Sequence, residues 1–241
     1  MTMIIFGSNG RLGRSLSKEF PEALRPSHSE VDITDRESVF RYIEAHRPDV
    51  VFQGAAWVDV RGCEVDHKKA WEFNVEGTRN VVDAVESVNG GCYFVFPSTA
   101  CVFHGDRGGY VETDVPNPIN FYGVTKMIAE MIVARLPNHL IMRTDFVERA
   151  KWRYPGAFTD RYSTSVFADT LSRGIKRVMS EKKTGLLHLT GKSKISHYDL
   201  ARITTPEVER MTLSDVDIPL PRDQSMKSVR GGDFLEVEMR A

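Results

Sequence analysis

The stretch IIFGSNGRLGRSLSKEF, residues 4–20, joins an apolar segment to a segment with helical spacing. Met3 to Phe6 are apolar without interruption, which is typical of a strand buried on both faces. The segment that follows carries an apolar residue at every fourth position, at Leu12, Leu16 and Phe20. Three glycines lie between the two segments, Gly7, Gly10 and Gly13. The stretch therefore predicts a strand, a tight turn and a helix.

Glycines at this spacing suit the binding of a dinucleotide. They permit a tight turn, let the backbone approach a pyrophosphate and let the helix pack close to the strand. The N-terminus of the helix would supply N–H donors and the positive end of its dipole to the phosphates. A glycine-rich turn of some other α/β protein is the alternative interpretation.

The rest of the chain alternates between strand-like and helix-like patterns. Strand-like runs occupy residues 50–52, 92–96 and 139–143, and helical spacing covers residues 39–43, 70–82 and 122–136. This alternation predicts an α/β fold, a Rossmann-type doubly wound parallel sheet, with ligands at the carboxyl ends of the strands. We expect the dinucleotide-binding domain in residues 1–145. A small substrate-binding lobe is expected in residues 146–241, interleaved in part with the first domain.

Composition excludes several classes of protein. The chain has 241 residues, 41% of them hydrophobic and 27% charged, and a formal net charge of −1. This charge gives no reason to expect nucleic acid or an anionic membrane as a partner. No segment is apolar enough to span a bilayer and no signal-peptide pattern is found, so a cytoplasmic location is expected. The cysteines, Cys63, Cys92 and Cys101, are odd in number and lack metal-type spacing, which favours reduced thiols and no metal site.

Several motifs together resemble an extended short-chain dehydrogenase/reductase. They are the three glycines, Gly54-Ala55-Ala56, NVEGT at 74–78, STACVF at 98–103 and NPINFYGVTK at 117–126. Within that superfamily, residues 31–66 and 116–130 are most similar to the dTDP-4-dehydrorhamnose reductase family. The resemblance implies reduction of a 4-keto-6-deoxy nucleotide sugar with a nicotinamide cofactor, in deoxysugar biosynthesis. A homodimer is an expectation taken from the family.

Tyr122, Lys126 and Thr99 are the candidate catalytic residues. Tyr122 and Lys126 are four positions apart in a helical segment, so both side chains lie on one face. An ammonium near the phenol would lower its pKa from the usual value of about 10, which suits a proton donor. Thr99 ends a predicted strand and could hydrogen-bond the substrate carbonyl. The resemblance implies these same roles, with Lys126 also holding the nicotinamide ribose. A plain surface pair of tyrosine and lysine is the alternative.

The remaining candidates concern cofactor and substrate. Ser27 and His28 stand near the end of the expected second strand, where an acidic residue would favour NAD. With Arg11 in the glycine loop they predict a preference for NADPH, and the alternative is NADH held by Glu30 or Asp32. The full set of cofactor-binding candidates is Gly7, Asn9, Gly10, Arg11, Leu12, Gly13, Ser27, His28, Asp32, Ile33, Gly54, Ala55, Ala56, Asn74, Tyr122 and Lys126. Phe146 is a candidate for stacking on the sugar or base, and Arg222 for binding a nucleotide phosphate.

Two positions depart from the reductase pattern. Ala100 and Cys101 stand where such reductases usually carry aspartate and tyrosine, which leaves no carboxylate there for a dehydratase. Cys101 resembles the cysteine of GDP-fucose synthase, so a nucleotide-sugar epimerase or epimerase/reductase is an alternative. The histidine that such chemistry needs is missing near residues 156–167, and Cys101 is interpreted as a small buried residue. A third alternative is a non-catalytic NADP-binding subunit similar to the β-subunit of methionine adenosyltransferase.

Overall fold

A five-stranded parallel sheet forms the centre of the molecule. The computed structural model describes residues 1–88 and 90–230. The strands lie in the order β1-β2-β3-β4-β9, and every adjacent pair is parallel. Their bounds are β1 Met3–Phe6, β2 Val50–Gln53, β3 Tyr93–Thr99, β4 His139–Thr144 and β9 Gly185–His188. The Rossmann-type α/β fold predicted from the sequence is confirmed.

The expected second strand is reduced to a single bridge. Leu24 pairs with Ile4 on the free side of β1, with backbone hydrogen bonds of 2.8 and 2.9 Å. Pro21 and Pro26 flank Leu24, and a proline has no N–H to donate to a ladder, so the pairing cannot extend. Because the chain pairs first on this side of β1 and later returns to the other side as β2, strand order reverses at β1. In open α/β sheets ligands bind at such a reversal, so the carboxyl end of β1 is where a ligand is expected.

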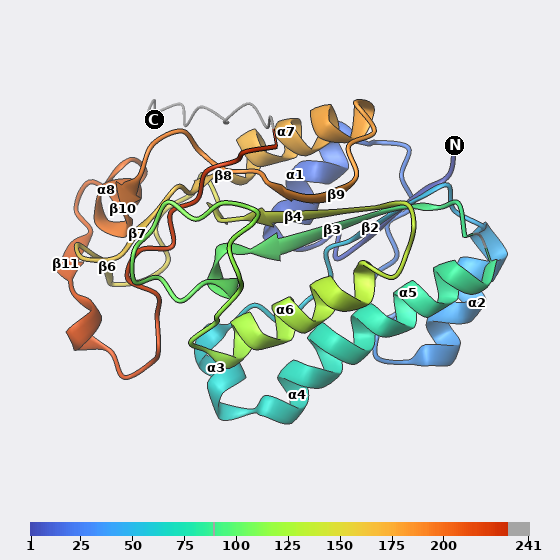
Figure 1. The fold of residues 1–241 in the computed structure, drawn as a ribbon, viewed down its shortest axis with the longest axis horizontal. Helices are drawn as coiled ribbons and strands as arrows, with labels where there is room; N and C mark the ends of the chain where they lie inside the picture. The colour runs from blue at the N-terminus through green and yellow to red at the C-terminus, as the bar shows by residue number, and fades with distance from the viewer. Residues whose placement is uncertain (89, 231–241) are drawn as a thin grey trace.

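Helices cover both faces of the sheet (Figure 1). Helices α1 Arg11–Glu19 and α7 Ala168–Ser180 pack on one face, and α2 Arg36–His46, α5 Gly77–Val88 and α6 Phe121–Val133 pack on the other. Alternate side chains of β1 enter opposite clusters, since Ile4 and Phe6 join one hydrophobic core while Met3 and Ile5 join the other. Two short helices, α3 Val60–Val65 and α4 His67–Trp71, lead through a π-helical turn, Glu72–Glu76, into α5.

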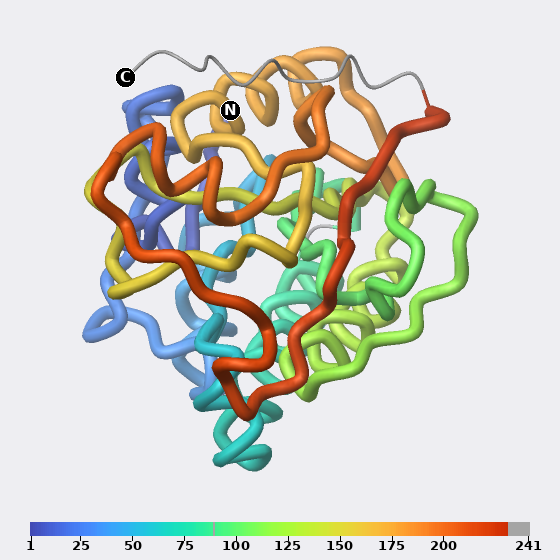
Figure 2. Tube along the Cα trace, turned by 90° about the vertical axis from the view of Figure 1, so that its left-hand side faces the viewer, coloured from blue at the N-terminus to red at the C-terminus, as the bar shows by residue number. Residues whose placement is uncertain are grey.

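The smaller part of the fold lies beyond the carboxyl ends of the strands. The arrows of β3 and β4 point toward it in Figure 1. It contains β5 Phe146–Val147 paired with β8 Val166–Phe167, β6 Gly156–Phe158 with β11 Glu209–Met211, β7 Tyr162–Ser163 with β10 Ile195–Ser196, and α8 His197–Arg202. Helix α7 and strand β9 come between these segments along the chain. Strand β9 nevertheless forms the edge of the main sheet, and α7 packs on that sheet. The last described segment, in red, crosses this end of the molecule (Figure 2).

The substrate-binding lobe expected in residues 146–241 includes residues 231–241, which lie outside the described residues. Among the residues that the structure describes, no helix is long and apolar enough to cross a membrane.

Candidate active site

The glycine loop brings β1, α1 and the end of β2 into very close contact. Gly7 has a φ of +76°, and a Cβ there would lie 2.6 Å from the backbone nitrogen of Ala55. A Cβ at Gly13 would lie 2.1 Å from the carbonyl oxygen of Gly7. Side chains at these two positions would therefore separate the helix from the loop. The predicted strand–turn–helix unit is present in the form that a dinucleotide site requires.

The N-terminus of α1 fits a phosphate group. Gly10 is the N-cap residue and has no side chain with which to make a capping hydrogen bond. The first turn contains no acidic residue. The first helical N–H groups therefore have no side-chain acceptor at the cap and face no nearby carboxylate of their own turn. Leu12 is buried against the sheet, and the carbonyl oxygen of Asn9 accepts a hydrogen bond from Arg14. The glycine loop and the N-terminus of α1, together called the glycine cradle, fit the pyrophosphate of a dinucleotide.

Arg11 lies toward the substrate side of the loop. Its guanidinium carbon is 5.9 Å from the centroid of the Phe146 ring, and its charge acts to lower the pKa of Tyr122. One predicted cofactor residue and one predicted substrate residue are thus neighbours across the crevice.

The segment after Leu24 contains its own hydrogen bonds. The Ser27 N–H and hydroxyl both donate to Glu30 Oε2, at 2.8 and 2.7 Å. His28 Nε2 lies 3.6 Å from Asp32 Oδ2, and the other oxygen of Asp32 accepts from the Thr34 backbone. These contacts keep Glu30 engaged with Ser27.

Asn74 fixes the loop that follows β2. Its Oδ1 accepts the Trp57 N–H at 2.7 Å, and its Nδ2 donates to the Trp57 carbonyl and to Thr125 Oγ1, both at 3.0 Å. Asn74 lies in the π-helical turn, a conformation that is common at functional sites. Its side chain therefore anchors the Gly54-Ala55-Ala56 segment to α6.

Three other cofactor candidates take part in hydrogen bonds through their backbone. Asn80 Nδ2 donates to the Ile33 carbonyl at 2.9 Å, and the Gly54 N–H donates to the Phe6 carbonyl at 3.0 Å. The Ala55 carbonyl accepts from Gln53 Nε2 at 3.3 Å. The Gly54–Phe6 bond continues the pairing of β1 with β2 beyond the end of the strands.

Helix α6 brings Tyr122 and Lys126 to the end of β3. Asn120 caps the helix by accepting the Gly123 N–H at 2.8 Å. A Cβ at Gly123 would lie 2.3 Å from the Cys101 carbonyl oxygen, so this glycine lets the helix approach β3 closely. Tyr122, Lys126 and Thr99 are 9%, 4% and 9% exposed. A hydrogen bond joins the side chains of Thr99 and Tyr122.

Burial controls the protonation of this pair. It raises the pKa of Tyr122 above its usual range, and the hydrogen bond from Thr99 and the charge of Arg11 offset only part of that rise. Burial also lowers the pKa of Lys126 to about 7, against an opposing effect of Glu130. Lys126 Nζ donates to the Pro97 carbonyl at 2.9 Å and lies 3.9 Å from the centroid of the Phe96 ring.

The prediction that the lysine lowers the pKa of the tyrosine is therefore wrong for this structure. Helical spacing places Tyr122 and Lys126 on one face, but burial is the largest effect on each pKa, and the charge that acts to lower the pKa of Tyr122 is that of Arg11.

Thr144 adds an unpartnered hydroxyl beside Thr99. The two residues are paired in register between β3 and β4. Thr144 Oγ1 is buried and has no hydrogen-bond partner among the described residues. A buried hydroxyl in that state suits a ligand atom in the crevice.

A polar cluster surrounds Cys101 on the substrate side. The Cys101 thiol donates to Gln224 Oε1 at 3.5 Å, and Arg161 Nη2 donates to the same oxygen at 3.2 Å. Gln224 Nε2 donates to Asp145 Oδ2 at 2.9 Å. Burial raises the pKa of the Cys101 thiol. Arg222, two residues before Gln224, is exposed, and its carbonyl accepts the Tyr162 N–H.

Sequence reasoning missed Arg161 and Gln224. They are 63 positions apart. The available signal was the candidate Arg222, which stands two residues before Gln224.

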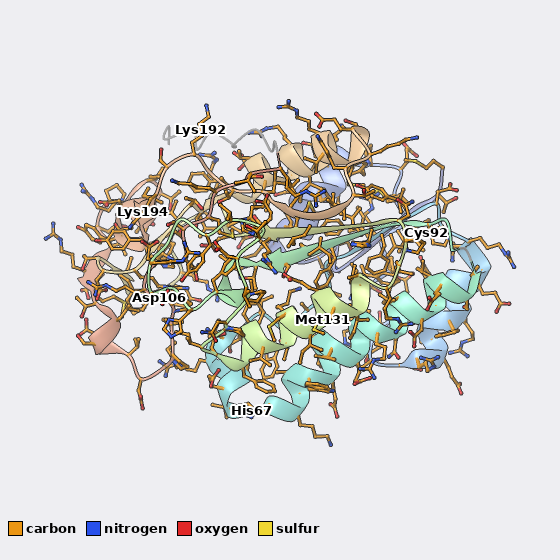
Figure 3. The ribbon with its side chains drawn as sticks, in the orientation of Figure 1. His67, Cys92, Asp106, Met131, Lys192 and Lys194 are labelled. Atoms are coloured by element: carbon orange, nitrogen blue, oxygen red, sulfur yellow. The ribbon has the colours of Figure 1, made fainter. Side chains whose placement is uncertain are left out.

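The other two cysteines lie away from this cluster. All three cysteines are free thiols. Cys92 precedes β3 at the end of the sheet opposite Thr99, as Figure 3 shows, and burial raises its pKa to about 12. His67, also labelled in Figure 3, stacks on Phe121 at 3.9 Å between ring centroids and so packs α4 against the start of α6. Within the described residues, no group of three histidine, cysteine, aspartate or glutamate side chains could hold a metal ion.

Known proteins resemble this chain in sequence and in fold. It is 32% identical over 226 residues to dTDP-4-dehydrorhamnose reductase of Aggregatibacter actinomycetemcomitans, covering 83% of this chain and 76% of that protein. It is 32% identical over 149 residues to methionine adenosyltransferase 2 subunit beta of Rattus norvegicus, covering 57% of this chain and 43% of that protein.

A solved structure shares the whole architecture. The dTDP-4-dehydrorhamnose reductase of Bacillus anthracis, crystallised in complex with NADP, superposes with a TM-score of 0.87 over 98% of this chain and 95% of that one, at 24% identity. The profile of the RmlD substrate binding domain family matches residues 1–153. With more than half of its length matched by that profile, the chain belongs to the RmlD substrate binding domain family.

Proposed function

We propose that this protein reduces the keto group of a 4-keto-6-deoxy nucleotide sugar with NADPH, as a dTDP-4-dehydrorhamnose reductase does in deoxysugar biosynthesis. The observation that carries the proposal is the burial of Thr99, Tyr122 and Lys126 together beside the glycine cradle. The relatives named dTDP-4-dehydrorhamnose reductase and the NADP complex support it. In this proposal residues 1–145, with α7 and β9, hold the cofactor, and the other carboxyl-terminal segments hold the sugar.

The residues of the cradle would hold the cofactor. Gly7, Gly10 and Gly13 would admit the pyrophosphate, the N-terminus of α1 would donate to it, and Lys126 would hold the nicotinamide ribose. When bound, NADPH supplies a hydride to the substrate carbon.

Tyr122 would act as the proton donor. Its raised pKa keeps the phenol protonated at neutral pH, and the oxygen of the reduced carbonyl is a strong enough base to take that proton. The hydroxyl of Thr99, already bonded to Tyr122, would stabilise the negative charge that develops on that oxygen. Lys126 in its ammonium form would stabilise the phenolate that remains.

Substrate contacts are proposed on the opposite wall. Phe146 would stack on the sugar or base, and the exposed Arg222 would meet a nucleotide phosphate. The side chains of Arg161 and Gln224 would orient the sugar next to Cys101. A homodimer and a cytoplasmic location are further parts of the proposal, and light scattering of the purified protein tests the first.

The preference for NADPH is supported by the NADP complex of the similar reductase and by the engagement of Glu30, which accepts two hydrogen bonds from Ser27. Arg11 was predicted to favour NADPH as well, but its guanidinium lies beside Phe146 and acts on Tyr122. A comparison of apparent Michaelis constants for NADPH and NADH tests this preference, and a lower constant for NADH would refute it.

The alternatives receive less support. An epimerase would need Cys101 as a thiolate, whereas burial raises its pKa and its proton is donated to Gln224. The similarity to the methionine adenosyltransferase subunit keeps a cofactor-binding, non-catalytic role as a second candidate.

One assay separates these functions. NADPH absorbance is followed with purified protein and dTDP-4-dehydro-L-rhamnose generated in situ, with Tyr122→Phe as the control. Oxidation that depends on the sugar and on Tyr122 is expected. Binding of NADPH without turnover would refute the reductase and favour the subunit role. Solvent deuterium entering carbon would instead support epimerisation.

A further inference from the structure

A buried ion pair lies directly behind the proposed catalytic residues. Glu130 and Arg143 are 7% and 3% exposed. Arg143 Nε donates to Glu130 Oε1 at 3.0 Å and Nη2 donates to Oε2 at 2.7 Å, so the pair is bidentate. Arg143 comes from β4 and Glu130 from α6, and the pair therefore joins the helix to the sheet.

Three consecutive residues of β3 each contact this helix. The Pro97 carbonyl accepts from Lys126, the Ser98 hydroxyl donates to Glu130 Oε1, and the Thr99 side chain bonds to Tyr122. The helical partners are four residues apart, at positions 122, 126 and 130, so they form one face of α6. Glu130 belongs to the same contact row as the two proposed catalytic residues of the helix.

The charge of Glu130 also acts on Lys126. Burial disfavours the ammonium, and Glu130 is the charged group that acts in the opposite direction. Arg143 from β4 pairs with that carboxylate. Lys126 itself contacts the neutral Pro97 carbonyl and the Phe96 ring of β3, and Tyr122 stands four residues earlier on α6.

We propose that Glu130 is a positioning residue whose carboxylate, held by Arg143 and Ser98, locks α6 onto the end of β3 and keeps Lys126 in its ammonium form. The catalytic half of this inference rests on the proposed function, because the ammonium matters only if Tyr122 donates a proton. A purely structural pair would hold the helix without affecting the ionisation of Lys126.

The variants separate charge from shape. Glu130→Gln keeps the shape of the side chain and removes its charge, but it leaves Arg143 buried without a counter-ion, which destabilises a protein strongly. The double variant Glu130→Gln with Arg143→Met removes both charges and so guards against loss of folding. Ser98→Ala is the matched control, because it loses one hydrogen bond of Glu130 and keeps both charges.

The first measurement is independent of turnover. The protein is labelled with ¹³C-lysine, the Lys126 signal is identified by its absence from the Lys126→Arg spectrum, and its titration is followed by NMR. In folded Glu130→Gln the midpoint is expected to fall by about one pH unit, a tenfold change in the ratio of ammonium to amine, and in the double variant by less, because that variant also loses the positive charge of Arg143. Ser98→Ala should leave the midpoint near that of the wild type. An unchanged midpoint in folded Glu130 variants would overturn the inference.

The second measurement is the pH profile of turnover. Above the Lys126 midpoint the rate should fall, and this basic limb should move to lower pH by the same amount in the Glu130 variants. A slower rate with an unmoved limb would mean that the pair only holds the helix, and the inference would be overturned. If the NMR midpoint shifts while even the wild type reduces no keto sugar, the effect of Glu130 on Lys126 stands and the proposed function fails.

Discussion

Gly13→Ala should damage both the stability of the protein and its binding of NADPH. The added Cβ would lie 2.1 Å from the Gly7 carbonyl oxygen and 2.7 Å from Ser8 Cα, both of them backbone atoms that cannot rotate away. A close carbon–oxygen contact is about 3.3 Å, so α1 would have to withdraw by roughly 1 Å. Leu12 and Leu16 of this helix are buried in the core and would move with it.

The size of the effect follows from this packing. Forcing a methyl group into a close-packed site costs about 1–3 kcal/mol. At about 2–4 °C per kcal/mol for a chain of this size, a cost near the middle of that range lowers Tm by roughly 4–8 °C. Because the same movement displaces the N–H groups at the start of α1, the Kd for NADPH should rise about tenfold, which corresponds to about 1.4 kcal/mol.

Thermal denaturation and calorimetric titration with NADPH measure the two effects. Gly90→Ala is the matched control, because its Cβ would meet nothing within 4 Å. Gly10→Ala should give a smaller effect, since its Cβ would lie 3.1 Å from the Gly7 oxygen. If Gly13→Ala matched the Gly90→Ala control in Tm and in Kd, the close packing of helix and loop would not be what forms the site.

Four other changes have defined outcomes. Arg11→Ala should leave the ratio of NADPH to NADH affinity near that of the wild type, because its guanidinium lies beside Phe146 and acts on Tyr122; a tenfold fall of the ratio in binding titrations would place Arg11 at the ribose phosphate. Asn74→Ala should destabilise the protein by about 1–3 kcal/mol in denaturant unfolding, because the backbone of Trp57 loses its partner; wild-type stability would contradict that role. The pKa of Lys126 is about 7 in the folded protein and 10.5 in the unfolded chain. Between pH 7 and pH 10.5 Lys126 is therefore protonated in the unfolded chain and largely deprotonated in the folded protein. The unfolding free energy of the wild type should therefore rise relative to Lys126→Met between pH 7 and pH 10, and a flat difference would refute the lowered pKa. Cys101→Ser should retain most of the carbonyl reduction, and a loss as large as that of Tyr122→Phe would reinstate Cys101 in the chemistry.

Local patterns were sufficient for the main elements and for the helical spacing of Tyr122 and Lys126. The strand before the glycines, the helix after them and the spacing of Tyr122 and Lys126 all follow from short-range sequence, and the structure has each of them. The second strand was not recoverable in the same way, because the prolines around Leu24 limit its pairing to one bridge.

The electrostatics of the site needed the tertiary structure. Helical spacing places an ammonium and a phenol on one face, but only their burial decides that the pKa of the tyrosine rises and that of the lysine falls. The neighbours of Cys101 likewise come from distant parts of the chain, namely Arg161 and Gln224, and the Lys126 ammonium donates to Pro97 of β3.

The sequence by itself determined the order of strands and helices, the glycine turn and the positions of the hydroxyl, phenol and ammonium groups. These features depend on periodicity and on steric requirements within a few residues. The tertiary structure decided which groups lose water and which distant side chains become their neighbours. Desolvation and long-range pairing depend on how the whole chain packs, and no local pattern records them.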